Sequence, residues 1–178
     1  MSINGNSILL RAIERDDLKL LHLWANNESI QLMLGGWHFP TNMNDQYTWF
    51  ENLSCNSLNQ RFIVENEAKQ PIGLANIINI NFKDGNAEIG LLLDGQFQGK
   101  GYGKKIVEAI SDYAFFQLRL NRLETTIISI NQPSLKLFLN KCGWKQEGIL
   151  RSWYYRNGTY IDKIILSKLK EEHSNQFL

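Results

Sequence analysis

The chain has 178 residues, 43% of them apolar, and its 19 basic and 18 acidic side chains leave a formal net charge of +1. This length suits one globular domain with its own core, and the near-zero charge argues against general binding to nucleic acid. No stretch reaches the roughly 18 apolar residues of a membrane-spanning helix, and the N-terminus lacks the basic and apolar segments of a signal peptide. We therefore expect a cytoplasmic location and no membrane partner.

Cysteine and histidine are too few and too scattered to predict a metal site. Cys55 and Cys142 lie far apart without a CxxC partner, and the three histidines are spread along the chain. Structural zinc needs ligands at short, regular spacings, and a disulfide framework needs more cysteines. We expect neither a metal nor a disulfide.

The first half of the chain predicts a strand, two helices and then three strands. Residues 7–13 read as a strand, and apolar residues recur at helical spacing from Leu18 to Trp24. Glycines and a proline at 35–40 interrupt the chain before a second short helix at 45–53. Three strand-like runs joined by polar turns then predict an antiparallel meander, at residues 61–65, 72–80 and 87–93.

The second half predicts two helices and three strands. An amphipathic helix with Ile106, Val107 and Ile110 in phase follows a glycine-rich loop. It leads to a strand at 123–129, which a helical crossover makes parallel to the strand before it. Another helix begins near Pro133, and Asn-Gly at 157–158 predicts a hairpin between the last two strands. We expect a domain at residues 7–168 and a polar tail at 169–178.

Three glycines in alternate positions mark the loop between the third strand of the meander and the helix. Gly99, Gly101 and Gly103 let the backbone approach a ligand and leave N–H groups at the positive end of the helix dipole, an arrangement suited to phosphate. A Walker A loop is excluded because Lys105 stands where Ser or Thr would hold magnesium. A dinucleotide fingerprint is excluded because the spacing is GxGxG and a meander precedes it.

The pattern Gln98-x-x-Gly101-x-Gly103, between a strand and a helix, resembles the GNAT superfamily of acetyl-coenzyme A N-acetyltransferases. The resemblance covers nearly the whole chain. Within the superfamily, the chain resembles the branch that holds ribosomal-protein alanine, spermidine and several amino-sugar acetyltransferases. Other segments that match this branch in order are residues 11–18, 131–134 and 142–144.

The resemblance implies a single α/β domain with a mixed, mostly antiparallel sheet, one central parallel splayed pair and helices on both faces. It also implies acetyl-CoA as co-substrate, with the pyrophosphate on the backbone of the glycine loop and the pantetheine arm between the splayed strands. Lys100 and Lys104 either meet the ribose phosphate or form a solvated helix start. The implied acetyl-CoA-binding residues are Leu91, Leu93, Gln98, Gly99, Lys100, Gly101, Tyr102, Gly103, Lys104, Asn131 and Ser134.

Acetyl transfer to an amine needs a base for the amine and a proton for the departing thiolate. By resemblance, Glu88 at the end of its strand is the base, directly or through water. The tyrosine that many relatives carry in the last helix is absent, because the span from Asn131 to Gly143 is one residue longer and places Phe138 or Leu139 there. We expect Ser134 to replace it, with Tyr154 among the alternatives, in direct transfer without a covalent intermediate.

The acceptor follows from the loop after the first helix, which is acidic in relatives that act on spermidine. Residues 34–42 contain no acid, which favours an amino sugar or a protein N-terminus over a polyamine. The expected acceptor-binding residues are Trp37, Phe39, Glu88 and Tyr154. A non-catalytic acyl-CoA-binding module is the alternative of another class, and a homodimer stays open.

Overall fold

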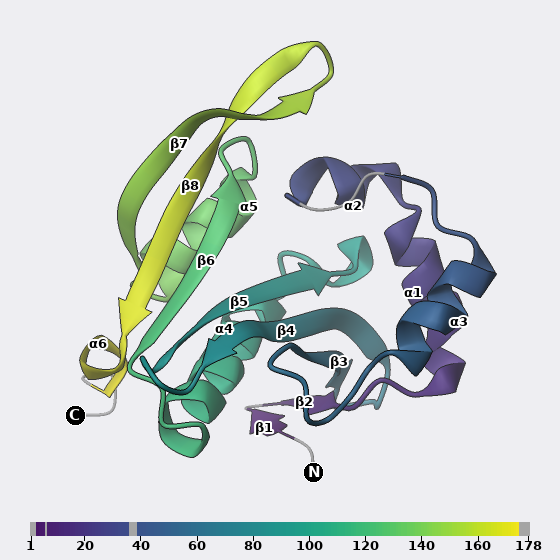
Figure 1. Ribbon diagram of the computed structural model, residues 1–178, viewed down its shortest axis with the longest axis horizontal. Helices are drawn as coiled ribbons and strands as arrows, with labels where there is room; N and C mark the ends of the chain where they lie inside the picture. Colours follow the sequence, from purple (N-terminus) through teal and green to yellow (C-terminus); the bar gives the residue numbers. More distant parts are fainter. Residues whose placement is uncertain (1–2, 6, 36–38, 175–178) are drawn as a thin grey trace.

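A single mixed sheet forms the centre of the molecule. The computed structural model describes residues 3–5, 7–35 and 39–174. The sheet has eight strands in the order β1-β2-β3-β4-β5-β6-β8-β7 (Figure 1). Their bounds are β1 Ile3–Gly5, β2 Ile8–Arg11, β3 Gln60–Asn66, β4 Pro71–Asn81, β5 Asn86–Leu93, β6 Arg122–Ile128, β7 Lys145–Arg156 and β8 Thr159–Leu169.

All neighbouring strands are antiparallel except β5 and β6, which confirms the predicted mixed sheet. These two strands pair only at their beginnings, from Asn86 with Arg122 to Glu88 with Glu124. Beyond that point they diverge, and each stays paired with its other neighbour (Figure 1). The predicted splayed pair is thus confirmed, and the sheet opens just past Glu88.

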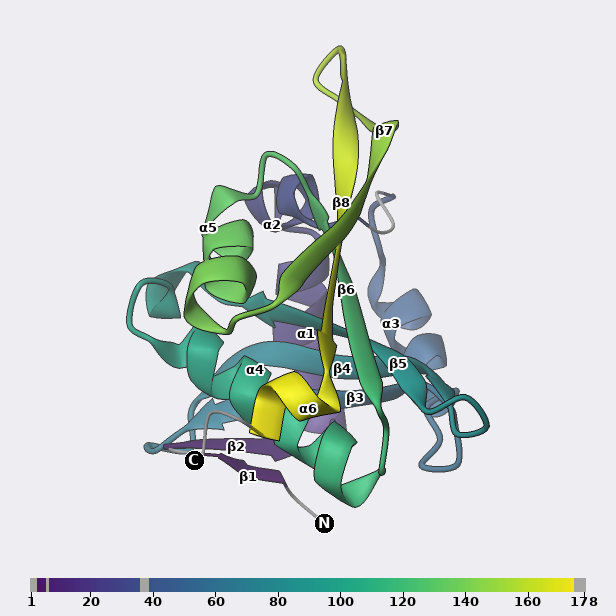
Figure 2. The ribbon, with the colours of Figure 1, turned by 90° about the vertical axis from the view of Figure 1, so that its left-hand side faces the viewer.

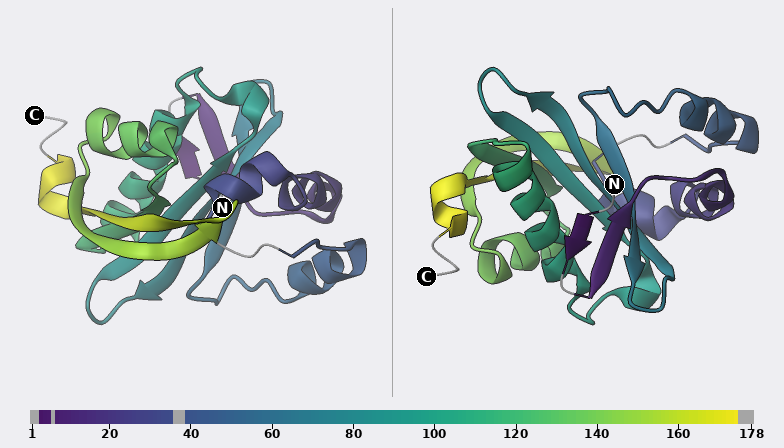
Figure 3. Two further views of the ribbon diagram at one scale, coloured as in Figure 1. Left: turned by 90° about the horizontal axis from the view of Figure 1, so that it is seen from above. Right: turned by 90° about the horizontal axis from the view of Figure 1, so that it is seen from below.

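Helices cover both faces of the sheet, as predicted (Figure 3). Their bounds are α1 Leu18–Ala25, α2 Glu28–Met33, α3 Met43–Glu51, α4 Tyr102–Asp112, α5 Gln132–Leu135 and α6 Lys170–Ser174. Successive residues of a strand point to opposite faces, so Val64 joins a large core under α4 while Ile63 joins a smaller one under α1 and α3. The same alternation puts Glu88 on the α1 side, since Ala87 and Ile89 face α4.

Two helices end in π-helical turns, at Tyr113–Gln117 after α4 and at Lys136–Lys141 after α5. A π turn holds one residue more than an α turn of the same rise. In the second turn the Cys142 N–H donates to the Leu137 carbonyl at 3.0 Å, which takes up the extra residue counted between Asn131 and Gly143. Phe138 is buried there with its ring edge-on to Trp144, and it has no proton to donate.

Strands β7 and β8 form a long two-stranded arm that extends past the rest of the sheet (Figure 2). The register between β7 and β8 shifts between Leu150 and Tyr154. These two residues are four positions apart, whereas their partners on β8, Lys163 and Ile161, are only two positions apart. Ser152 takes a left-handed conformation in this bulge, with φ 53°, and its N–H donates to Asp162 Oδ1 at 2.8 Å. The bulge determines where the side chains beyond it point.

The sequence patterns missed β1, α2 and α6. The last of these falls in the predicted polar tail, where residues 170–174 form a short helix whose His173 is buried, with Nε2 2.6 Å from Asp112 Oδ1. Short elements carry too little periodic signal to be found this way, and tertiary contacts stabilise them. Among the described residues, no helix is both long and apolar enough to cross a membrane.

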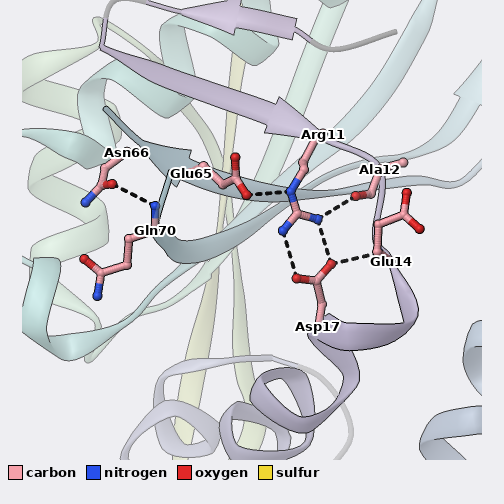
Figure 4. Close-up of polar contacts among 7 residues, drawn as sticks. All are labelled: Arg11, Ala12, Glu14, Asp17, Glu65, Asn66 and Gln70. Carbon is pink, nitrogen blue, oxygen red and sulfur yellow. Dashed lines mark hydrogen bonds and ion pairs between the residues drawn. The ribbon is translucent and has the colours of Figure 1, made fainter. Parts of the chain in front are cut away.

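Arg11 ties the first strand to the first helix and to the neighbouring strand (Figure 4). Its guanidinium makes a bidentate pair with Asp17 at 2.7 and 2.9 Å, and its Nε donates to Glu65 at 2.6 Å. Burial of Asp17 disfavours its charge, but hydrogen bonds from Arg11 and the Glu14 N–H outweigh burial and lower the pKa of the carboxyl. Arg11 is therefore structural and not a ligand-binding cation.

We expect Arg11→Ala to lower the free energy of unfolding by about 2–3 kcal/mol, since two largely buried carboxylates lose their partner. Denaturant titration measures the loss, with the exposed Arg15→Ala as control. Because the folded-state pKa of Asp17 is lowered, the Arg11 contribution is present above the ordinary Asp pKa and is lost as pH falls through the folded value. Equal stability of the two variants at pH 7 would contradict the assignment.

Candidate active site

The loop between β5 and α4 exposes backbone N–H groups at a helix start. Gly99 and Gly101 have φ values of 74° and 87°, and a Cβ on either residue would meet nothing within 4 Å. Gly101 is the N-cap of the 11-residue α4 and supplies no side-chain cap, so the first N–H groups of the helix keep no side-chain partner at this position. The loop thus fits a phosphate group approaching along the helix axis.

Other residues of the loop hold its shape. Gln98 Nε2 donates to the carbonyl of Leu93 at 3.0 Å, which ties the loop to the end of β5. The rings of Phe97 and Tyr102 meet edge to face at 6.2 Å. Gly103 differs from the other two glycines, because a Cβ there would lie 3.0 Å from Leu137 Cδ2. Its small size therefore serves close packing of α4 against the helix that follows α5.

Three lysines surround the loop. Lys100 Nζ lies 5.4 Å from the centre of the Phe97 ring, and Lys105 Nζ lies 5.7 Å from the centre of the Tyr102 ring. Lys104 Nζ lies 3.4 Å from Glu108 one turn along α4. These contacts are at the surface and weak, so the ammonium groups can turn to an anion at little cost.

The diverging strands offer backbone edges to an extended ligand. Leu91 and Leu93 pair with Ala75 and Gly73 of β4, so the other edge of β5 faces the opening. Asn131 lies across this opening at the N-cap of α5, where its Oδ1 accepts from the Ser134 N–H at 3.1 Å. Both side-chain groups of Asn131 are engaged, since Nδ2 donates to the Met33 carbonyl at 3.2 Å.

Three side chains from three strands meet where β5 and β6 separate. Thr126 Oγ1 lies 3.5 Å from Glu88 Oε1. Tyr154, only 7% exposed, reaches the same place from the arm. Burial raises the pKa of the Tyr154 phenol above its usual value and the charge of Glu88 adds to the rise, while Arg156 and a hydrogen bond with Thr126 oppose it. We call Glu88, Thr126 and Tyr154 the fork cluster.

The end of α2 closes over the fork cluster. Arg156 Nη2 donates to the Leu34 carbonyl at 3.2 Å, and the guanidinium lies over the Tyr154 ring, 5.3 Å from its centre. A side chain at Gly35 would collide with the Tyr154 hydroxyl. Phe39 is 67% exposed, and the predicted acceptor residue Trp37 lies outside the described residues.

The sheet face beside the fork cluster carries further polar groups. Asn76 lies over Gly90, where a Cβ would meet its Oδ1 at 2.8 Å. This Oδ1 is buried and has no hydrogen-bond partner among the described residues. Glu124 is the register partner of Glu88 and shares Arg122 with Glu147. The face therefore presents several oxygen acceptors to an incoming amine.

Sequence reasoning found Glu88 and Tyr154 in this region but missed Thr126, Asn76 and Arg156 as members of it. Alternation along each strand shows which residues share a face, so the sequence alone could have placed Thr126 and Glu124 on one face of their strand. It cannot show which strand lies beside which, and the contacts of Asn76 and Arg156 depend on that.

The glycine loop, the splayed strands and the order of elements agree with one family. The model of the acetyltransferase (GNAT) domain matches residues 7–145. The chain belongs to the GNAT acetyltransferase family. The expectation of an acetyl-CoA-dependent N-acetyltransferase is thereby confirmed at the level of the family.

Several relatives match this acetyltransferase over nearly its whole length. Spermidine N(1)-acetyltransferase of Vibrio cholerae is 29% identical over 173 residues, which cover 97% of this chain and 98% of that protein. An uncharacterized N-acetyltransferase, p20, of Bacillus licheniformis is 32% identical, and the match covers 94% of this chain and 95% of that protein.

A solved structure agrees with the fold of the acetyltransferase. The crystal structure of the V. cholerae spermidine N-acetyltransferase, in complex with CoA and spermine, superimposes with a TM-score of 0.88 at 27% identity. The superposition covers 95% of this chain and 99% of that one.

We expect Gly101→Ala to raise the KM for acetyl-CoA about tenfold, because a side chain at φ 87° costs roughly 1–2 kcal/mol and displaces the N–H groups at the start of α4. Gly95→Ala is the matched control, since its Cβ also meets nothing within 4 Å but its φ is not left-handed. Steady-state kinetics with varied acetyl-CoA measure both. Similar KM values for the two variants would remove the loop from acetyl-CoA binding.

Proposed function

We propose that the enzyme transfers the acetyl group of acetyl-CoA to a primary amine of a linear aliphatic polyamine of the spermidine class, directly in a ternary complex. The observation that supports the acceptor best is the near full-length match to a spermidine N(1)-acetyltransferase, together with the TM-score of 0.88 to a homologue held with CoA and spermine. This acceptor was only the alternative in our sequence-based reading.

The sheet face supplies the oxygen acceptors for ammonium groups that the loop after the first helix lacks. A polyamine needs several acceptors for its ammonium groups, and residues 34–42 contain no acid. Glu88 and Glu124 stand side by side in the parallel register, and Asn76 adds a buried oxygen without a partner among the described residues. A flexible chain of amines can therefore run along the sheet with its reacting end at Glu88.

Each part of the site then has a chemical task. The N–H groups at residues 98–104 hold the pyrophosphate, and the free edge of β5 at Leu91 and Leu93 pairs with the amides of the pantetheine arm. Asn131 and Ser134, at the start of α5, border the pantetheine arm of acetyl-CoA. Glu88 accepts the proton of the attacking amine, so that its lone pair can reach the thioester carbonyl.

The acid-free segment favours a second candidate acceptor. An amino sugar or a peptide N-terminus carries one amine and needs one carboxylate to bind it, which Glu88 supplies. Exposed Phe39 could then face the rest of such a molecule.

An acceptor screen that follows release of the CoA thiol separates these candidates. We expect kcat/KM for spermidine and spermine to exceed that for glucosamine, amino-sugar nucleotides and N-terminal peptides by at least about tenfold, since each further ammonium paired with a carboxylate adds binding. A preference for a monoamine would refute the polyamine, and a failure of every amine tested to release the CoA thiol would leave an acyl-CoA-binding module.

Glu88→Gln tests the base. We expect kcat to fall about a hundredfold because an amide cannot take the proton, while the KM for acetyl-CoA changes little. Glu67→Gln, in the exposed turn between β3 and β4, makes the same chemical change away from the site. Full activity of Glu88→Gln at pH 7 would exclude Glu88 as the base.

A further inference from the structure

We propose that Tyr154 protonates the departing CoA thiolate, and that Thr126 connects it to Glu88. In the acetyl transfer proposed above, on which this assignment rests, some group must supply that proton. Phe138 and Leu139, which stand in the place of the relatives' tyrosine, have none to give. The fork cluster offers the phenol from the opposite side of the opening, on the arm.

The bulge in β7 places the phenol. Tyr154 pairs with Ile161 after the register shift, and its side chain turns inward while that of the next residue, Tyr155, is 59% exposed. The bulge is held by the bond from the Ser152 N–H to Asp162. Bulges of this kind recur next to active sites, where they direct one side chain.

Segments on two sides hold the ring. The guanidinium of Arg156 lies over one face of the ring and is itself bound to the Leu34 carbonyl. Gly35 lets the hydroxyl approach the backbone, because any side chain there would collide with it. The phenol is thus held before a substrate arrives, as a catalytic acid needs to be.

The reacting sulfur lies within reach of this position. The glycine loop follows Leu93, and the strands separate at Glu88, five residues back along β5. Five strand residues span about 17 Å, which an extended pantetheine arm covers. A pantetheine arm whose pyrophosphate is bound at the glycine loop therefore ends beside the fork cluster.

The protons balance over one turnover. The amine nitrogen bonds to the acetyl carbon, the carbon–sulfur bond breaks, and the amine proton passes to Glu88. Tyr154 gives its proton to the thiolate and becomes a phenolate. The Thr126 hydroxyl both donates and accepts, so it passes the proton of Glu88 on to Tyr154 and restores the starting state.

Ser134 is placed less well for this step. Its N–H is bound to Asn131 within α5, and its hydroxyl makes no hydrogen bond to Glu88, Thr126 or Tyr154. A proton lost from Ser134 would have to come back from solvent. Ser134 thus stays a predicted acetyl-CoA contact.

The test compares Tyr154→Phe with Tyr155→Phe in the full-length enzyme, using the best amine from the acceptor screen. We expect Tyr154→Phe to lower kcat about a hundredfold with acetyl-CoA affinity within twofold of wild type, and Tyr155→Phe, whose side chain is 59% exposed, to keep kcat within about threefold. Calorimetry with CoA and the thermal midpoint check that Tyr154→Phe is folded and binds.

Two further measurements distinguish an acid from a packing residue. Thr126→Val breaks the connection at constant volume and should lower kcat at least tenfold, while Thr126→Ser keeps the hydroxyl and should restore it. Glu88 and Arg156 are the charged groups that act on the phenol. With 3-fluorotyrosine at 154, a more acidic phenol, the alkaline limb of the kcat profile should move to lower pH.

Three results would overturn the proposal. These are a Tyr154→Phe variant with wild-type kcat, a variant that loses only acetyl-CoA affinity, and an alkaline limb that does not move with fluorotyrosine. If no amine releases the CoA thiol, the acetyl transfer itself fails; if spermidine fails but another amine succeeds, the Tyr154 test proceeds with that amine.

Discussion

The separation of β5 from β6 is the constraint on which the rest of the structure depends. Parallel strands that pair along their full length would satisfy their own backbone groups and leave no edge for a ligand. Here pairing stops after Glu88 and Glu124, and β5 and β6 each keep one neighbour. The unpaired edges, the glycine loop at the end of β5 and α5 at the end of β6 then all face one opening.

The arm and the N-terminal helices cover this opening from two sides. Arg156 and Asn131 bind the carbonyls of two consecutive residues at the end of α2, Leu34 and Met33. The start of α1 is fixed in turn by Arg11, which joins it to β2 and β3. This ionic contact thus anchors the helix that leads into α2, whose end covers the fork cluster.

The proposed polyamine acceptor depends on groups of a sheet face and not only on the loop after the first helix. The acid-free loop favoured an amino sugar or a protein N-terminus, yet Glu88, Glu124 and Asn76 present oxygen atoms from three strands. Residues far apart in the sequence contribute to this face, so counting acids in one segment measures its charge poorly. Similar reasoning applies to the missing tyrosine, because a proton donor can reach the fork from any neighbouring strand.

The sequence by itself determined the meander, the glycine loop, the crossover helix and the family, because these depend on local periodicity and on short motifs. It also located Glu88, since one strand carries both the carboxylate and the loop. Only the tertiary structure decided that a π turn absorbs the extra residue before Cys142, that residues 170–174 pack as a helix, and that a bulge turns Tyr154 toward Thr126. Each of these features results from contacts between segments that are distant in the sequence, and such contacts produce no periodic sequence pattern.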